Sequence, residues 1–122
     1  MIRVLVVDDD GLMRDLIHYF VDGYDDFQVV GSCADGREAL QVFPDLQPDV
    51  VIMDLSMPVM DGASATRALL DMDPLARVVL FTGAPDSRAA GAALAAGAFT
   101  CVDKKMDVQT LLNAVTAAAG RS

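Results

Sequence analysis

Apolar runs alternate with helix-forming segments along the whole chain, and this alternation restricts the fold more than any other feature of the sequence. Five runs are short, continuously apolar and in part β-branched, as expected for strands covered on both faces. They lie at Ile2–Val7, Phe27–Ser32, Val50–Met53, Arg77–Phe81 and Phe99–Val102. A helical pattern follows each of them. Alternating strands and helices predict a parallel sheet with helices on both faces.

The helical segments carry signals for their positions. The first has an apolar stripe formed by Leu12, Met13, Leu16, Ile17 and Phe20. Asp35 and Glu38 fit a capping box for the second helix, and the third is expected from about Gly62 to Leu70. Asp86 is a candidate N-cap for the Ala-rich fourth helix, which should end near Gly97. The last helix has apolar residues at helical spacing, namely Val108, Leu111, Leu112 and Val115.

Connection rules then restrict the topology. Crossovers between parallel strands are right-handed, which leaves few strand orders open. The first strand contains the very apolar sequence VLVV and is expected at the centre of the sheet. Five such units suit a doubly wound α/β fold of the flavodoxin-like type, with strand order 2-1-3-4-5. A length of 122 residues suits one domain, so we predict a single domain over residues 1–122.

Composition and charge argue against several classes of function. The formal net charge of −9 disfavours direct nucleic-acid binding by this domain. No apolar run reaches the ~18 residues of a membrane helix, and the N-terminal apolar stretch is too short for a signal peptide. Cys33 and Cys101 lack metal-ligand spacing and are expected to be reduced, packed thiols. These features predict a cytoplasmic protein without membrane contact.

Polar residues follow the predicted strands at the edge where such sheets bind ligands. Acidic residues follow strands one and three, namely Asp8, Asp9, Asp10 and Asp54. Strands one and three are neighbours, so their carboxylates would repel one another unless a cation relieved the repulsion. Mg2+ prefers oxygen ligands, and Thr82 and Lys104 after strands four and five are donors suited to a phosphoryl group. The set predicts a phosphate and Mg2+ site, although Asp10 is equally interpretable as a helix N-cap.

Four segments make the chain resemble the receiver domains of two-component response regulators over essentially its whole length. They are VVDDD at 6–10, VIMDLSMPVMDG at 51–62, FTG at 81–83 and VDKK at 102–105. The resemblance implies that Asp54 is the phosphoacceptor. It also implies that Asp8 and Asp9 form the acidic pocket for Mg2+, Asp9 more directly and Asp8 largely through water. The backbone carbonyl of Ser56 would be the third protein ligand.

The resemblance also implies roles around the phosphoryl group and outside the domain. Thr82 would hydrogen-bond one phosphoryl oxygen, and Lys104 would pair with another. The donor would be a phosphohistidine on a sensor histidine kinase. The domain would be a phosphorylation-controlled switch rather than an enzyme, although it supports its own phosphotransfer and slow autodephosphorylation. Homodimerisation on phosphorylation would fit the same family.

Several residues depart from the common pattern of that family. Cys101 stands where an aromatic side chain usually turns inward on activation, so coupling is expected to run mainly through the loop from Thr82 to Pro85. Lys105 stands where proline is common, as in the subfamily with a LuxR-type helix-turn-helix output. This implies a C-terminal DNA-binding domain outside this chain that controls transcription. Ser56 and Ala84 occupy positions that influence autodephosphorylation, so the phosphoryl lifetime stays open.

Other functions compete with this interpretation. The sequence DDDG at 8–11 fits the nucleophile motif of haloacid-dehalogenase-like phosphatases, with Asp8 as nucleophile and Asp10 as general acid. That class needs a late acidic metal motif, no suitable pair follows Lys104, and Asp54 would be left unexplained. A phosphorylation-independent interaction module with the same fold is a second alternative, against which the complete set of site residues argues. A flavin phosphate would be repelled by the acidic loop after the first strand.

Overall fold

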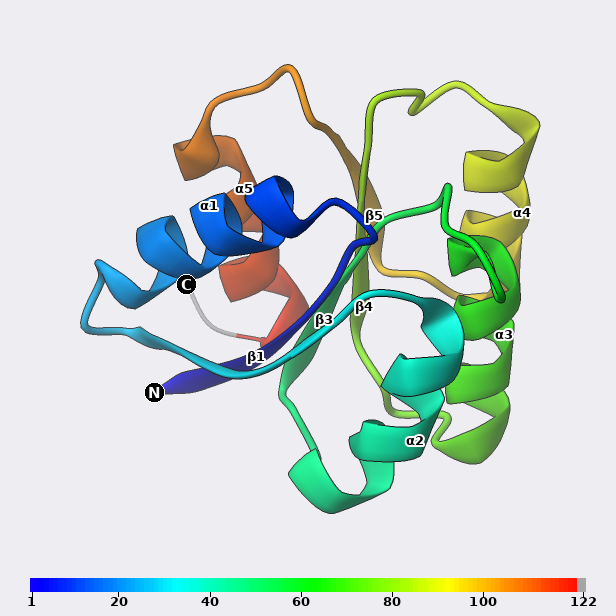
Figure 1. The fold of residues 1–122 in the computed structure, drawn as a ribbon, viewed down its shortest axis with the longest axis horizontal. Helices are drawn as coiled ribbons and strands as arrows, with labels where there is room; N and C mark the ends of the chain where they lie inside the picture. The colour runs from blue at the N-terminus through cyan, green and yellow to red at the C-terminus, as the bar shows by residue number, and fades with distance from the viewer. Residues whose placement is uncertain (121–122) are drawn as a thin grey trace.

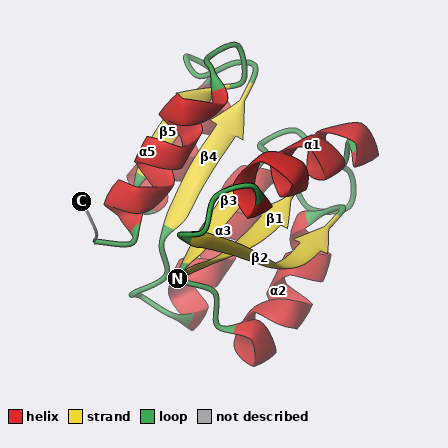
Figure 2. Cartoon of the chain, turned by 90° about the vertical axis from the view of Figure 1, so that its left-hand side faces the viewer, coloured by secondary structure: helices red, strands yellow, loops and turns green. Residues whose placement is uncertain are grey.

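The computed structural model describes residues 1–120, and within them five strands alternate with five helices. The strands are β1 (Ile2–Val7), β2 (Phe27–Cys33), β3 (Val50–Met53), β4 (Val78–Thr82) and β5 (Thr100–Asp103). The helices are α1 (Gly11–Asp22), α2 (Gly36–Leu46), α3 (Gly62–Met72), α4 (Arg88–Ala96) and α5 (Val108–Ala118). All strand pairs are parallel, in the order β2-β1-β3-β4-β5, which confirms the predicted fold (Figure 2). Residues 121 and 122 of the predicted domain lie outside the described part.

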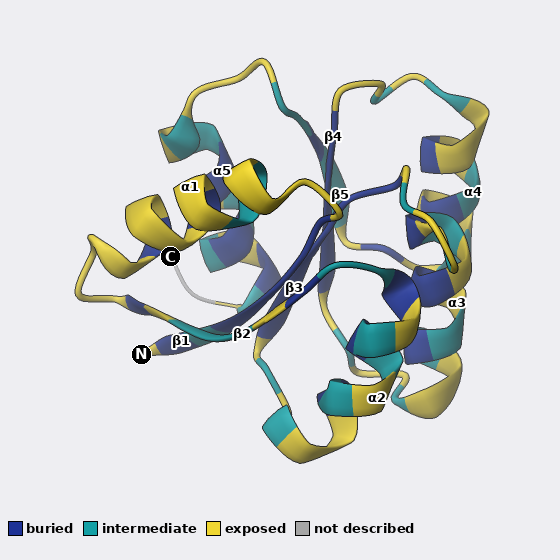
Figure 3. Cartoon of the chain, in the orientation of Figure 1, coloured by how far each residue is buried: buried dark blue, intermediate teal, exposed yellow. Residues whose placement is uncertain are grey.

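The helices cover the sheet in two layers. Helices α1 and α5 lie against one face, and α2, α3 and α4 lie against the other (Figure 1). Successive side chains of a strand point to opposite faces, so Val4 and Val6 of β1 join the core beneath α1 and α5, whereas Leu5 and Val7 join the other core. Both sets are at most 1% exposed, and the dark interior of the sheet is visible in Figure 3. The continuously apolar β1 is therefore a strand buried on both faces.

Three strands end one residue later than the apolar pattern predicts. β2 includes Cys33, β4 runs to Thr82, and β5 runs to Asp103. Thr82 and Asp103 are paired with each other in the β4–β5 ladder. Their backbones continue the strands although their side chains are polar, so an apolar pattern does not predict these two strand ends. The shift matters because it places Thr82 and Asp103 on rigid sheet rather than in loops.

The helix expected from the first apolar stripe is confirmed as α1, whereas the expected N-cap of α4 is wrong. The expected stripe on α1 is only partly buried, because Ile17 packs against the sheet while Leu12 is 69% exposed and Phe20 is 40% exposed. The buried residues of α1 are Ile17 and Val21, and Met13 packs against the same core while partly exposed. The N-cap of α4 is Ser87 rather than the expected Asp86, since the Ser87 hydroxyl oxygen accepts a hydrogen bond from the N–H of residue 90. An N-cap side chain accepts the amide two or three residues further on, and here Ser87 takes the amide of residue 90.

Both cysteines are free thiols on the two outer strands, Cys33 on β2 and Cys101 on β5. Burial raises the pKa of both thiols, to about 11 for Cys33. They are therefore protonated at neutral pH and behave as packing residues, as predicted. None of the helices among residues 1–120 is both long and apolar enough to cross a bilayer.

Candidate functional site

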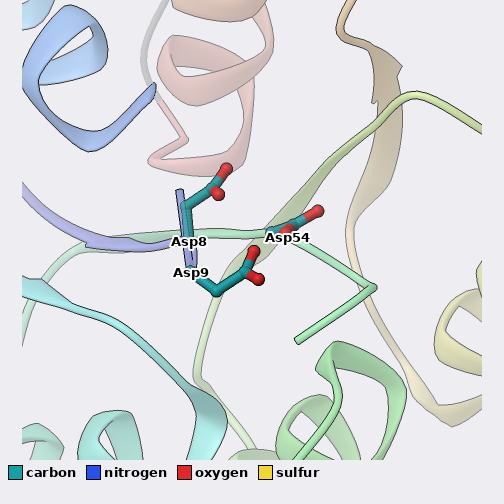
Figure 4. A group of neighbouring side chains, drawn as sticks. All are labelled: Asp8, Asp9 and Asp54. Carbon is teal, nitrogen blue, oxygen red and sulfur yellow. The ribbon is translucent and has the colours of Figure 1, made fainter. Parts of the chain in front are cut away.

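The sheet itself brings three carboxylates together. β1 and β3 are adjacent and in register, with Val7 opposite Met53, so the residues that follow them emerge side by side. The Asp54 N–H donates to the carbonyl of Val7 at 2.9 Å, which extends the ladder to the acidic residue. Asp8 and Asp9 leave the end of β1 at the same edge (Figure 4). Parallel pairing therefore fixes the backbones from which these side chains project.

The acidic cluster is tight and partly buried. Asp8, Asp9 and Asp54 each offer a carboxylate oxygen, and these oxygens lie within 4.8 Å of one another. Asp8 is 2% and Asp54 is 6% exposed, whereas Asp9 is open to solvent. Burial raises the pKa of the Asp54 carboxyl from its ordinary 3.8 to about 6, with a further increase from the charge of Asp8. The site thus holds more negative charge than its own residues neutralise.

Lys104 is the cation that faces this cluster. Its Nζ lies 2.9 Å from Asp8 Oδ2 and 3.2 Å from Asp54 Oδ1. Burial alone would lower the pKa of Lys104, but its bonds to the two carboxylates and their charges outweigh this, and the pKa rises. The Lys104 N–H also donates to the carbonyl of Thr82 at 2.9 Å, so the end of β4 holds the backbone from which the ammonium group reaches over.

The loop between β3 and α3 folds back so that its last residues contact its first residues. The Gly62 N–H donates to the carbonyl of Leu55 at 2.8 Å and closes the loop that follows Asp54. A Cβ atom at position 62 would overlap the Asp54 carbonyl oxygen and lie 2.7 Å from the Cα of Leu55. Only glycine therefore fits where the loop passes the backbone of Asp54.

The middle of this loop is strained and is held from outside. Val59 has a φ of 66°, a conformation that is a genuine outlier for a β-branched residue. It is the centre of a three-residue turn in which the Met60 N–H donates to the Pro58 carbonyl at 2.7 Å. The carbonyl of Met60 accepts the N–H of Gly36, at the start of α2, at 3.1 Å. Position 36 has no room for a Cβ, which would lie 2.7 Å from the Cβ of Ala65. The bond from the start of α2 thus helps to hold the strained conformation of Val59, which the loop would otherwise be expected to leave.

Thr82 and Ser56 lie on the opposite side of Asp54 from β1. Thr82 is 5% exposed, and its hydroxyl oxygen accepts a hydrogen bond from the Ala84 N–H at 3.1 Å. This bond uses the oxygen as an acceptor and leaves the hydroxyl proton to be donated elsewhere. Thr82 and the exposed Ser56 line a cavity of about 410 Å³ together with Asp61 and Ala84. The cavity joins the loop after β3 to the loop after β4.

Asp10 is an N-cap. Its Oδ1 accepts the N–H groups of Leu12 at 3.0 Å and Met13 at 3.4 Å, at the start of α1. It does not belong to the acidic cluster, which removes the general acid that the phosphatase alternative requires at this position. Asp10 thus orients α1, one of the two roles that the sequence left open.

Arg14 is a site neighbour that the sequence motifs do not identify. Its Nη1 donates to the backbone carbonyl of Asp8 at 2.7 Å. Helical side chains lean toward the N-terminus, so an arginine in the first turn of α1 can reach back over the preceding loop. An arginine six residues after Asp8, in the first turn of the next helix, is the sequence signal that could have identified this contact.

The donor set fits a hard divalent cation. Three carboxylates converge, and Lys104 bonds to two of them. The pKa of Asp54 is raised mainly by burial and further by the charge of Asp8, and a bound cation would relieve both. Oxygen-only ligands of this kind suit Mg2+, which commonly binds one or two protein carboxylates and completes its shell with water and phosphate. The cluster contains no thiol or imidazole that would favour zinc.

Comparison with known proteins gives a consistent match. Residues 4–116 match the family described as the response regulator receiver domain. The chain is 36% identical over 120 residues to protein CcdB of Bacillus subtilis, covering 98% of this chain and 99% of that protein. It is 39% identical over 82 residues to a protein-glutamate methylesterase/protein-glutamine glutaminase of Methanococcoides burtonii, covering 67% of this chain. The chain spans only 23% of the length of that relative.

Solved structures give the same result. A two-component response regulator of the LuxR family from Aurantimonas sp. SI85-9A1 superposes with a TM-score of 0.92 at 34% identity, covering 99% of this chain and 87% of that one. The CheX-CheY-BeF3-Mg2+ complex from Borrelia burgdorferi contains a chain with a TM-score of 0.86 at 26% identity, covering 95% of this chain and 87% of that one.

Proposed function

The chain belongs to the response regulator receiver domain family, and on that premise we propose that it is a Mg2+-dependent phosphoryl switch whose acceptor is Asp54. The observation that carries the proposal is the convergence of Asp8, Asp9 and Asp54 within 4.8 Å, with Lys104 bonded to two of them. We infer that Asp9 and Asp54 hold Mg2+ directly, with Asp8 acting largely through water. The carbonyl of Ser56 is the proposed third protein ligand.

The chemistry is an in-line displacement on phosphorus. An oxygen of the Asp54 carboxylate attacks the phosphorus of a phosphohistidine, a P–O bond forms, and the P–N bond breaks with its electron pair left on the imidazole nitrogen. Because the pKa of Asp54 is about 6, most of the carboxyl is ionised at neutral pH and available to attack. Mg2+, when bound, neutralises the charge of the phosphoryl oxygens. Transfer of this kind depends on positioning and charge stabilisation.

Lys104 and Thr82 act on the phosphoryl group once it is attached. Lys104 already lies 3.2 Å from the Asp54 carboxylate, so its ammonium is placed to pair with a phosphoryl oxygen there. Thr82 can turn its hydroxyl toward a second oxygen. If the Thr82 side chain rotates to reach that oxygen, its Oγ1 moves away from the Ala84 N–H, which loses its acceptor, and the loop after β4 must rearrange. A local charge change is thereby coupled to a packing change, as a switch requires.

The wider role is inferred from relatives. The similarity to a LuxR-family response regulator, with Lys105 after Lys104, supports an output domain that binds DNA and lies outside this chain. We propose a sensor histidine kinase as phosphodonor, a cytoplasmic location, and homodimerisation on phosphorylation. We assign no direct nucleic-acid contact to this domain, in keeping with its net charge of −9. The domain regulates rather than catalyses turnover of a substrate.

A matched pair of variants tests the metal and the transfer together. Asp9→Asn removes a proposed Mg2+ ligand, whereas Asp10→Asn removes the same charge one residue away and keeps a good N-cap. Mg2+ titration should show weaker binding only for Asp9→Asn, and its phosphorylation by acetyl phosphate should slow accordingly. Equal Mg2+ affinity in the two variants would contradict the assigned metal site.

A further inference from the structure

Arg14 lies on α1, outside the acidic cluster, and has no part in the transfer itself. Its Nη1 donates to the carbonyl oxygen of Asp8 at 2.7 Å. We propose that Arg14 is a positioning residue, which holds the peptide between Asp8 and Asp9 and so orients the backbone from which Asp9 projects toward Mg2+. The inference rests on the proposed Mg2+ site. In this proposal, a residue of α1 helps to hold the geometry of the metal site.

The contact is built into the start of α1. The Arg14 N–H donates to the carbonyl of Asp10 at 3.0 Å, so the backbone of the first turn is fixed before its side chain reaches back. The guanidinium then passes over Gly11, where a Cβ would lie 3.5 Å from Arg14 Nη2. A methyl group at position 11 would be in ordinary van der Waals contact with the guanidinium, and a branched side chain would add carbons beside the same group.

The Asp8–Asp9 peptide needs such an anchor on its carbonyl side. The Asp8 carboxylate is held by Lys104 at 2.9 Å and by the Asp10 N–H at 3.0 Å. The Asp9 side chain is exposed, and within residues 1–120 no hydrogen bond holds its carboxylate. No hydrogen bond selects its rotamer, so the backbone sets the range of directions that the carboxylate can take. A fixed Asp8 carbonyl fixes the peptide plane from which Asp9 projects.

The alternative is that Arg14 acts only as a nearby positive charge. The two roles predict opposite signs. A cation beside the site repels Mg2+, so its removal as a mere charge would tighten Mg2+ binding. Loss of an orienting partner weakens metal binding, commonly by 10-fold or more for groups one shell away from the ligands. The direction of change in Mg2+ affinity therefore separates the two.

The test uses Arg14→Met with Arg67→Met as its control, because Arg67 is exposed on α3 and its loss changes the net charge equally. Mg2+ titration followed by amide and carbonyl chemical shifts should show about 10-fold weaker binding for Arg14→Met and little change for Arg67→Met. In metal-free protein, the Asp8 carbonyl and Asp9 amide signals should move only in Arg14→Met. Unchanged or tighter Mg2+ binding in Arg14→Met would overturn the proposal.

A second pair keeps the charge and breaks the bond. Gly11→Val should displace the guanidinium and weaken Mg2+ binding, whereas Gly11→Ala should bind Mg2+ like the wild type. Where the Asp8 carbonyl signal shows that Gly11→Val has broken the bond, equal affinities in this pair would also contradict the role of Arg14. If the wild-type protein bound no Mg2+, the proposed metal site would fail on its own. The metal-free carbonyl signal of Asp8 would then still decide whether Arg14 holds the peptide, and an unmoved signal would refute it.

Discussion

Replacing the phosphoacceptor by asparagine should stabilise the fold at neutral pH. Asp54 is 6% exposed, and its carboxylate sits beside that of Asp8, so burial and repulsion both penalise its ionised form. Lys104 offsets only part of this cost, since the pKa remains raised to about 6. Asparagine is nearly isosteric and carries no charge. Asp54→Asn therefore removes a penalty that the native sequence retains for function.

The magnitude follows from the pKa. The carboxyl titrates at about 6 in the folded protein against an ordinary value of 3.8, and a change of one in pKa corresponds to ~1.4 kcal/mol. Between these two pH values the folded state binds more protons than the unfolded state, so the free energy of unfolding of the wild type falls as pH rises. The destabilisation caused by ionised Asp54 is absent well below pH 3.8 and complete above about pH 6. It reaches up to about 3 kcal/mol at pH 7.

Urea unfolding of both proteins between pH 3.5 and pH 8, without Mg2+, measures this difference. Asp54→Asn should match the wild type at the acid end and become progressively more stable through the window. Asp71→Asn, an exposed carboxylate on α3, is the control and should change stability by no more than about 0.5 kcal/mol. An Asp54→Asn variant less stable than the wild type at pH 7, or a difference independent of pH, would refute the reasoning.

Three further predictions concern neighbouring residues. Lys104→Ala should raise the pKa of the phosphoacceptor above about 6, visible by carboxyl NMR, and should abolish the response to fluoroberyllate without weakening Mg2+ binding. Gly62→Ala should lower the free energy of unfolding by more than about 3 kcal/mol in urea, whereas Gly83→Ala, with open space around it, should change it little. Thr82→Ala should strongly reduce the amide-shift changes that fluoroberyllate induces, and Cys101→Ala should leave them largely intact; the reverse result would contradict coupling through the loop after β4.

The sheet and the grouping of carboxylates could be predicted because they depend on regular patterns. Continuous apolar runs identify buried strands, and parallel strands necessarily present their carboxyl ends at one edge, so residues after β1 and β3 meet. Strand ends were less predictable. The pairing of Thr82 with Asp103 is a backbone property, which the polarity of their side chains conceals.

Contacts between segments distant in sequence could not be predicted. The apolar stripe of α1 is wider than its contact with the sheet, so the sequence could not distinguish buried Ile17 from exposed Leu12. Gly36 lies in α2, yet it fixes the loop after β3 through the carbonyl of Met60. The bond from Arg14 to the Asp8 carbonyl involves a backbone acceptor, which leaves no trace in a motif of side chains.

Intact-mass spectrometry after incubation with acetyl phosphate and Mg2+ tests the central claim most directly. The wild type should gain the mass of one phosphoryl group, the gain should disappear when Mg2+ is chelated, and Asp54→Asn should gain nothing. Asp54 is buried beside Asp8 in the acidic cluster and bonds to Lys104, which is the reason to expect a single acceptor. Equal phosphorylation of the wild type and Asp54→Asn would contradict the account.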